Sequence, residues 1–170
     1  MELILSREEE ERLLAFKRDM HMHPELSHQE FETSKKIRAF LETIPGMEIL
    51  KPDQDLTGVI ARLQGKKVKN SGGKEENLTG GKEENLTGGR EVNPAGPEVG
   101  LRADIDAIAQ TEVRQSPYRS QNPGVMHACG HDFHTASLLG AALLLSKYAD
   151  AWSGTVDFLF QEAEETTDGV

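Results

Sequence analysis

The chain has 170 residues, a length typical of one folded domain, and its 36% hydrophobic content is sufficient for a packed core. Its formal net charge of −10, without a basic cluster in the sequence, disfavours nucleic acid and anionic membrane surfaces as partners. A single cysteine cannot form an internal disulfide, and the N-terminal residues lack the basic leader and long apolar run of a signal peptide, so we expect a cytoplasmic protein.

Two helices are predicted at the start of the chain. Ser6 and Glu9 have the spacing of a capping box, and a helical pattern of apolar residues follows them. Ser27 and Glu30 repeat that spacing ahead of a second helical pattern, which a Pro-Gly pair ends. We therefore expect Ser27 and Glu30 to cap the second helix as Ser6 and Glu9 cap the first.

The segments that follow are typical of strands: MEIL from Met47, TGVIARL from Thr57, EVGLRADIDAI from Glu98 and TVDFLF from Thr155. Small and leucine-rich residues recur at helical spacing between Ala128 and Tyr148, which predicts a helix between the last two strands. Its most apolar part is far shorter than the roughly 20 residues that a membrane-spanning helix needs. This order of elements indicates an α/β fold.

Residues 66–97 interrupt the pattern with a low-complexity insertion. The unit GGKEENLT occurs at residues 72–79 and again at 80–87, and it then decays into GGREVNPA. Glycine pairs with charged and amide side chains bury too little apolar surface to offset the entropy lost on ordering. We expect a flexible surface loop without buried structure, and a binding role for this loop is the alternative.

The segment MHACGHDFHTA, residues 126–136, holds three histidines, an aspartate and the single cysteine at the predicted start of a helix. Thiolate, imidazole and carboxylate are the usual ligands of zinc-like ions, and a helix N-terminus lowers the pKa of a thiol. The C-x-H spacing is not that of a zinc finger, so two other interpretations of Cys129 stay open. It is then either a buried cysteine beside polar capping residues or a redox or regulatory thiol.

Acidic residues follow the last two predicted strands. Asp104 and Asp106 end one strand, and Glu162, Glu164 and Glu165 follow the other. Ligands of open α/β sheets bind at the carboxyl ends of the strands. Adjacent carboxylates there can divide metal coordination and proton transfer between them, and an aspartate can orient a ligand histidine. The alternative is that these side chains are simply solvated.

Four motifs occur in order along the chain: HMHPELS at 21–27, GLRADIDAI at 100–108, NPGVMHACGHDFHTA at 122–136 and FLFQEAEE at 158–165. Together they resemble the amidohydrolase branch of the dinuclear-metal aminoacylase and carboxypeptidase family, which includes hippurate hydrolases, N-acyl-amino-acid deacetylases and auxin-conjugate hydrolases. The resemblance implies a zinc-peptidase-like three-layer sandwich, with a mixed sheet flanked by helices. It also implies that residues 1–170 are the N-terminal part of the catalytic domain, without the dimerisation or lid domain and the C-terminal half.

By this resemblance Cys129, His131 and Glu165 are metal ligands, Glu164 is the catalytic base, and Asp106 lies behind the ligands. The family resemblance further implies two divalent ions, zinc or manganese, with nickel or cobalt as alternatives. The substrate implied is an N-acyl-amino acid or a peptide-like small molecule. Full-length relatives are expected to be homo-oligomers with two further histidine ligands, and the alternative for this chain is an inactive remnant that binds metal weakly or pairs with a complementary half.

Overall fold

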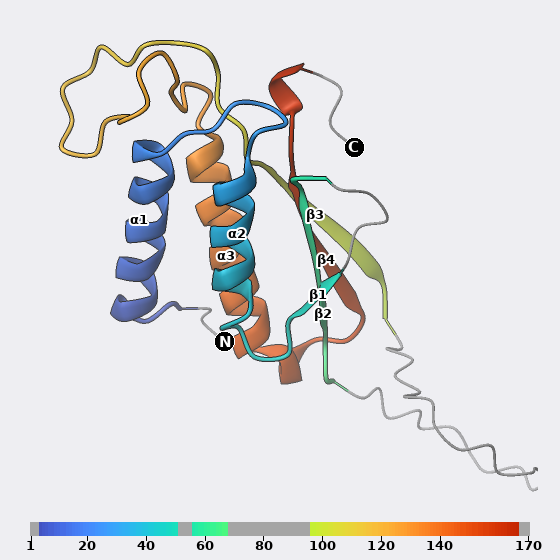
Figure 1. Ribbon diagram of the computed structural model, residues 1–170. Coiled ribbons are helices and arrows are strands. Elements are labelled where there is room, and N and C mark those ends of the chain that lie inside the picture. Colours follow the sequence, from blue (N-terminus) through green and yellow to red (C-terminus); the bar gives the residue numbers. More distant parts are fainter. Residues whose placement is uncertain (1–3, 51–55, 68–95, 167–170) are drawn as a thin grey trace, which may run out of the picture.

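The computed structural model describes residues 4–50, 56–67 and 96–166 (Figure 1). The GGKEENLT units, for which a flexible loop is expected, lie outside these ranges. Among the described residues no helix is long and apolar enough to cross a membrane.

The described elements match the predicted order of helices and strands, and the α/β prediction is confirmed. They are α1 Arg7–Met22, α2 Phe31–Leu41, β1 Glu48–Leu50, β2 Val59–Gln64, β3 Glu98–Asp104, α3 His131–Lys147 and β4 Thr155–Gln161, with the short 3₁₀ turns η1 Ala149–Ala151 and η2 Glu164–Thr166.

The four strands form one mixed sheet in the order β1-β2-β4-β3. Strand β2 pairs antiparallel with β1 and with β4, whereas β3 and β4 are parallel. All three α-helices of the described ranges lie on one side of this sheet (Figure 1). The mixed sheet flanked by helices that the resemblance implies is therefore confirmed. Helices α2 and α3 pack on the sheet, and α1 packs mainly against α3.

The apolar core lies between this helical layer and the sheet. Side chains alternate along β2, so that Val59, Ala61 and Leu63 are buried while the residues between them are less so. On the helical side, Leu139 of α3 is fully buried in the same cluster. The buried face of β2 and the leucine-rich face of α3 thus pack against each other in one core, as the sequence patterns predict.

The two predicted capping boxes differ in outcome. Ser6 accepts a hydrogen bond from the Glu9 amide, and the Glu9 carboxylate accepts one from the Ser6 amide, so the first box is confirmed. The second prediction is wrong, because α2 begins at Phe31 and the side chain of its N-cap residue, Glu30, makes no capping bond. The Ser27 hydroxyl also bonds elsewhere, to a carboxylate 79 residues away.

Truncating a core leucine should cost far more stability than truncating an exposed one. Leu139 is 0% exposed and Leu14 of α1 is 53% exposed. Leu139→Ala should lower the free energy of unfolding by about 2–5 kcal/mol, because it removes buried methyl groups and leaves a cavity. Leu14→Ala, the matched control, should change it by no more than about 0.5 kcal/mol. Urea denaturation of both variants measures the difference, and equal losses would contradict the core described above.

Candidate metal centre

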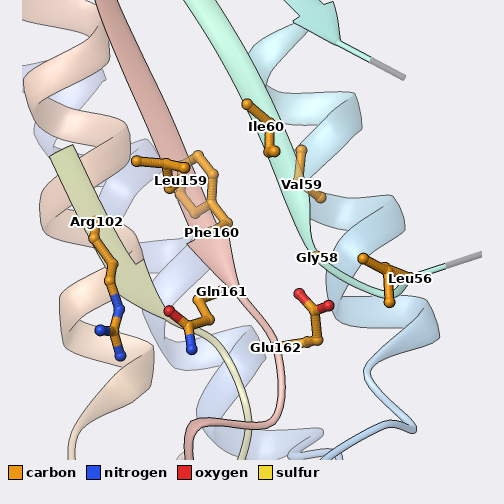
Figure 2. A pocket seen from close by; sticks show the side chains of 9 residues that line it. All are labelled: Leu56, Gly58, Val59, Ile60, Arg102, Leu159, Phe160, Gln161 and Glu162. Atoms are coloured by element: carbon orange, nitrogen blue, oxygen red, sulfur yellow. The ribbon is translucent and has the colours of Figure 1, made fainter. Parts of the chain in front are cut away.

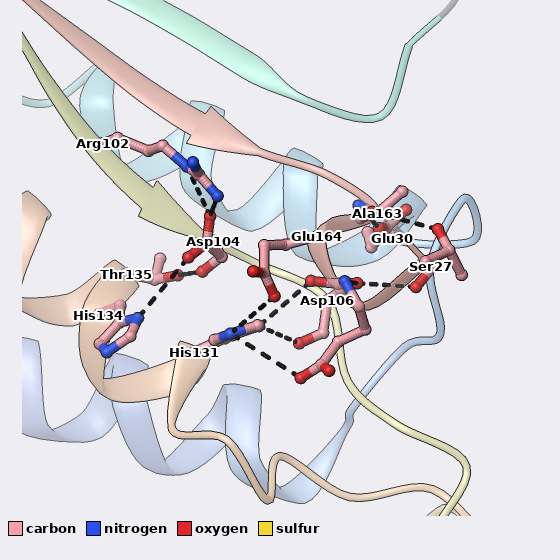
Figure 3. A network of polar contacts seen from close by, with 12 residues as sticks. Ser27, Glu30, Arg102, Asp104, Asp106, His131, His134, Thr135, Ala163 and Glu164 are labelled. Atoms are coloured by element: carbon pink, nitrogen blue, oxygen red, sulfur yellow. Dashed lines mark hydrogen bonds and ion pairs between the residues drawn. The ribbon is translucent and has the colours of Figure 1, made fainter. Parts of the chain in front are cut away.

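Three segments that are distant in sequence meet at one edge of the sheet. Because β3 and β4 are parallel and Asp104 pairs with Gln161, the chain leaves both strands at the same edge. Helix α3 connects these two strands, and its first residue, His131, lies at that edge as well (Figure 3). The carboxyl ends of two strands and the N-terminus of one helix therefore deliver their polar side chains to one place.

His131 is oriented by Asp106. His131 is 4% exposed, and its Nδ1 lies 3.0 Å from the Asp106 carbonyl oxygen and 3.2 Å from Oδ1 of the same residue. Since both partners are acceptors, the ring proton belongs on Nδ1 and the lone pair of a neutral ring is on Nε2. Burial lowers the pKa of His131, but the hydrogen bonds to Asp106 outweigh that effect and raise it.

The other ring nitrogen of His131 faces the two neighbouring glutamates. Nε2 lies 3.7 Å from Oε2 of Glu164 and 3.9 Å from Oε1 of Glu165. One ligand atom from each of the three side chains falls within 4.8 Å of the others. Oε1 of Glu165 is buried and has no hydrogen-bond partner in the described structure. A buried acceptor without a donor is costly, and a cation bound by imidazole and carboxylate would satisfy it.

Asp106 also binds the backbone of the turn after β4, which carries Glu164 and Glu165. Its Oδ2 accepts hydrogen bonds from the Ser27 hydroxyl at 2.7 Å and from the Glu165 amide at 3.0 Å. Burial raises the pKa of Asp106, but the bonds from His131, Glu165 and Ser27 outweigh it and lower the pKa from the usual 3.8 to about 2. The aspartate that sequence reasoning placed behind the ligands thus contacts one proposed ligand through its ring and another through its amide.

Cys129 lies beside the histidine–glutamate group rather than within it. Its thiol is exposed, which contradicts the interpretation as a buried cysteine. A hydrogen bond to Glu165, the partial loss of water around the thiol and the nearby negative charges raise the pKa of Cys129 to about 11. The prediction that the helix N-terminus lowers the pKa of Cys129 is therefore wrong, because the nearby carboxylates raise it by more than the helix lowers it. The interpretation of Cys129 as a redox thiol required a low pKa and is wrong for the same reason. A divalent cation would supply the positive charge that favours a thiolate here.

The three histidines of MHACGHDFHTA lie in different environments. His131 faces the glutamates, whereas His134 is half exposed and lies 4.0 Å from Asp104. Asp104, His131 and His134 form a second group with ligand atoms within 4.8 Å, which sequence reasoning missed although the i, i+3 histidine spacing is visible. Arg102 already contacts Asp104 at 2.6 Å and competes for its charge. His127 is buried, and burial lowers its pKa to about 4.

Glu162, the first acidic residue after β4, is separate from the centre. Its side chain lines a pocket of about 130 Å³ together with residues of β2, β3 and β4 (Figure 2). Gly58 makes room for it, because a Cβ at that position would overlap the Glu162 carboxylate. Of the acidic residues that follow the last strand, only Glu164 and Glu165 approach His131 among the described contacts.

Removing the Asp106 carboxylate should lower the free energy of unfolding more than removing the Asp104 carboxylate. Asp106→Ala leaves the part-buried donors of Ser27 and Glu165 without their acceptor, and each such donor costs about 1–3 kcal/mol, whereas His131 keeps only the backbone carbonyl of residue 106. Asp104→Ala is the matched control, because the side chain of Asp104 pairs with a half-exposed Arg102 and should be worth no more than about 1 kcal/mol. Urea unfolding at pH 7 compares the two, and equal losses would contradict the central place of Asp106.

The same carboxylate predicts an acid-sensitive component of stability. Because folding lowers the pKa of Asp106 from 3.8 to about 2, its contribution is complete above pH 4 and is lost as the pH falls toward 2. The stability difference between the wild type and Asp106→Asn should shrink over that interval.

The chain is similar in sequence to known hydrolases. Residues 100–170 match the model described as peptidase family M20/M25/M40. An N-acetylcysteine deacetylase from Bacillus subtilis is 43% identical over 158 residues, which cover 93% of this chain and 34% of that protein. An N-acyl-L-amino acid amidohydrolase from Geobacillus stearothermophilus is 37% identical over 157 residues, which cover 92% of this chain and 35% of that protein.

A solved structure gives the same result for the fold. The Bacillus subtilis YXEP protein, described as a dinuclear metal binding peptidase from the M20 family, superposes with a TM-score of 0.78 and 41% identity over 97% of this chain and 38% of its own. The chain spans about a third of the length of the curated relatives it matches. In its motifs, its sequence and its fold, the chain is thus similar to members of peptidase family M20/M25/M40, and the family model itself matches residues 100–170.

Proposed function

We propose that these residues form part of the metal centre of an enzyme that hydrolyses the amide bond of N-acyl-amino acids or related small amides. The observation that carries the proposal is the convergence of His131 Nε2 with the Glu164 and Glu165 carboxylates, where a buried glutamate oxygen has no donor among the described residues. The names of two relatives, an N-acetylcysteine deacetylase and an N-acyl-L-amino acid amidohydrolase, support the substrate class.

His131, Glu165 and Cys129 would hold the metal. Imidazole and thiolate with carboxylate favour zinc, nickel or cobalt over calcium and magnesium, which prefer all-oxygen sites, and the family resemblance adds manganese. The family resemblance and the description of the YXEP protein as dinuclear support two ions. Such ions, when bound, polarise the amide carbonyl and acidify a water molecule.

Burial supports different roles for the two glutamates. The side chain of Glu165 is 21% exposed, its amide is tied to Asp106, and one of its oxygens is buried without a donor. The side chain of Glu164 is 39% exposed. A fixed, less exposed carboxylate is suited to hold a metal, whereas a more accessible one can take a proton from water and pass it to the leaving amine.

Hydrolysis as proposed needs more ligands than these residues provide. The resemblance implies two further histidines, and the relatives are about three times as long as this chain. We therefore propose amide hydrolysis for a full-length enzyme and metal binding for the residues described here. A homo-oligomeric enzyme and a cytoplasmic location stay predictions.

Substituting the two glutamates separately should produce opposite defects. Glu164→Gln should keep metal bound, because it leaves the proposed ligands intact, but should lower turnover by about 10² to 10⁴, because an amide cannot accept the proton. Glu165→Gln should weaken metal binding, and added metal should restore part of the activity.

Metal content of both variants of this chain is measured by elemental analysis after dialysis against manganese or zinc. Turnover is measured with an N-acetyl-amino acid in a full-length enzyme that contains both glutamates. If Glu164→Gln empties the site while Glu165→Gln leaves it full, the two roles are reversed. A wild-type chain that retains no metal would refute the proposed centre.

A further inference from the structure

The segment from the motif HMHPELS to Glu30 contacts residues of the metal centre, through Ser27 and Glu30, but takes no part in the chemistry proposed above. We propose that Ser27 and Glu30 are positioning residues, which with Asp106 fix the turn that carries Glu164 and Glu165. The importance of this turn for metal binding rests on the proposed function, whereas the hydrogen bonds that define the inference can be tested without a metal.

Glu30 is a fully buried carboxylate with both oxygens engaged. Oε1 accepts a hydrogen bond from the Ala163 amide at 2.9 Å, and Oε2 accepts one from the Thr57 hydroxyl at 2.7 Å. Taking a carboxylate out of water is costly, and the surrounding donors must compensate. Hydrogen bonds to a charged acceptor are about twice as strong as neutral ones. Glu30 is thus a strong and directional anchor for Ala163, 133 residues away.

Ala163 needs such an anchor because of its backbone conformation. Its φ of 51° lies in the left-handed region, which is disfavoured for residues with a Cβ. The Glu30 carboxylate holds the Ala163 amide, and the Thr166 hydroxyl donates to the Ala163 carbonyl at 3.1 Å. With the peptide groups on both sides of Ala163 held, the chain turns sharply after β4 and directs the next two side chains toward His131.

Ser27 acts on the same turn through Asp106. Its hydroxyl donates to the Asp106 Oδ2 atom that also accepts the Glu165 amide. The amides of Ala163 and Glu165, on either side of Glu164, therefore both donate to buried carboxylates. Figure 3 shows the contact between Ala163 and Glu30. A separate hydroxyl, from Ser27 or Thr57, orients each carboxylate.

Glu25 explains why Ser27 and Glu30 are free for this role. Its carboxylate accepts hydrogen bonds from the amides of Glu32 and Thr33, the second and third residues of α2, at 3.2 and 2.7 Å. Glu25 thus satisfies the donors that an N-cap side chain ordinarily takes. Glu25 therefore caps α2, and Ser27 and Glu30 bond instead to Asp106 and to the Ala163 amide.

Amide hydrogen exchange of this chain, read residue by residue by NMR without metal, tests the inference. Ser27→Ala should speed exchange at Glu165 and leave Ala163 unchanged. Glu30→Ala should do the reverse, with exchange at Ala163 faster by about 10-fold or more relative to a core amide such as Phe158, because a hydrogen bond to a charged group is lost. Glu30→Gln, which keeps an oxygen toward the Ala163 amide, should show a smaller effect.

The control is Glu9→Ala in the exposed capping box of α1, which has the same sequence spacing but no contact with the turn. It should leave exchange at both site amides unchanged relative to Phe158. In a competition titration with a coloured chelator, Glu30→Ala should lower Mn²⁺ affinity about 10- to 100-fold, the usual effect of losing a residue that orients a ligand, and Glu9→Ala should not.

The outcomes separate this inference from the proposed function. Uniform acceleration of all amides in the Ser27 and Glu30 variants would overturn the inference, because it would show a general loss of stability instead of separate anchors. Unchanged exchange at Ala163 in both Glu30 variants would overturn it as well, even if the wild type binds Mn²⁺. If the wild type binds no Mn²⁺ but the site-specific exchange pattern appears, the proposed function fails and the anchoring of the turn stands. If Glu30→Ala does not fold, Glu30→Gln and Ser27→Ala decide the question.

Discussion

The candidate centre depends on one buried carboxylate that accepts hydrogen bonds from three segments. Asp106 receives the Ser27 hydroxyl from the segment ahead of α2, the ring of His131 from the start of α3, and the Glu165 amide from the turn after β4. Each donor stabilises the negative charge, which lowers the pKa of Asp106 to about 2 although burial opposes it. The same charge fixes the His131 tautomer and so exposes Nε2 to the glutamates. Orientation and electrostatics of the site thus have one origin.

The fold makes that arrangement possible through the parallel pairing of β3 and β4. A parallel pair needs a crossover, and α3 provides it, so the helix begins at the edge where both strands end. The polar residues after each strand and the first residue of the helix are brought together by topology. A second anchor, Glu30, adds to Asp106 at the turn, so that two buried negative charges lie beneath two further glutamates. A cation at this place would offset that concentration of charge.

Features that depend on local pattern could be predicted from the sequence, and features that depend on distant partners could not. The order of elements and the capping of α1 follow from residues within a few positions of one another. Ser27 and Glu30 have the same spacing as Ser6 and Glu9, but their partners are Asp106 and Ala163, and Glu25 caps α2 in their place. The prediction of a lowered pKa for Cys129 is wrong for the same reason, because the strongest influence on this thiol comes from Glu165, a residue distant in sequence. The motif resemblance nevertheless predicted that His131 and Glu165 lie close together, because family motifs reflect residues that are adjacent in the fold.

Anomalous X-ray diffraction from crystals of this chain grown with Mn²⁺ or Zn²⁺ would locate a bound metal ion. We expect a peak of anomalous density beside His131 Nε2 and Glu165 Oε1, at about 2.0–2.2 Å from each donor atom. The group of Asp104, His131 and His134 offers a rival position at the same edge of the sheet. A peak there alone, bound without Glu165, or density at neither place with metal bound elsewhere on the chain, would contradict the metal centre described here.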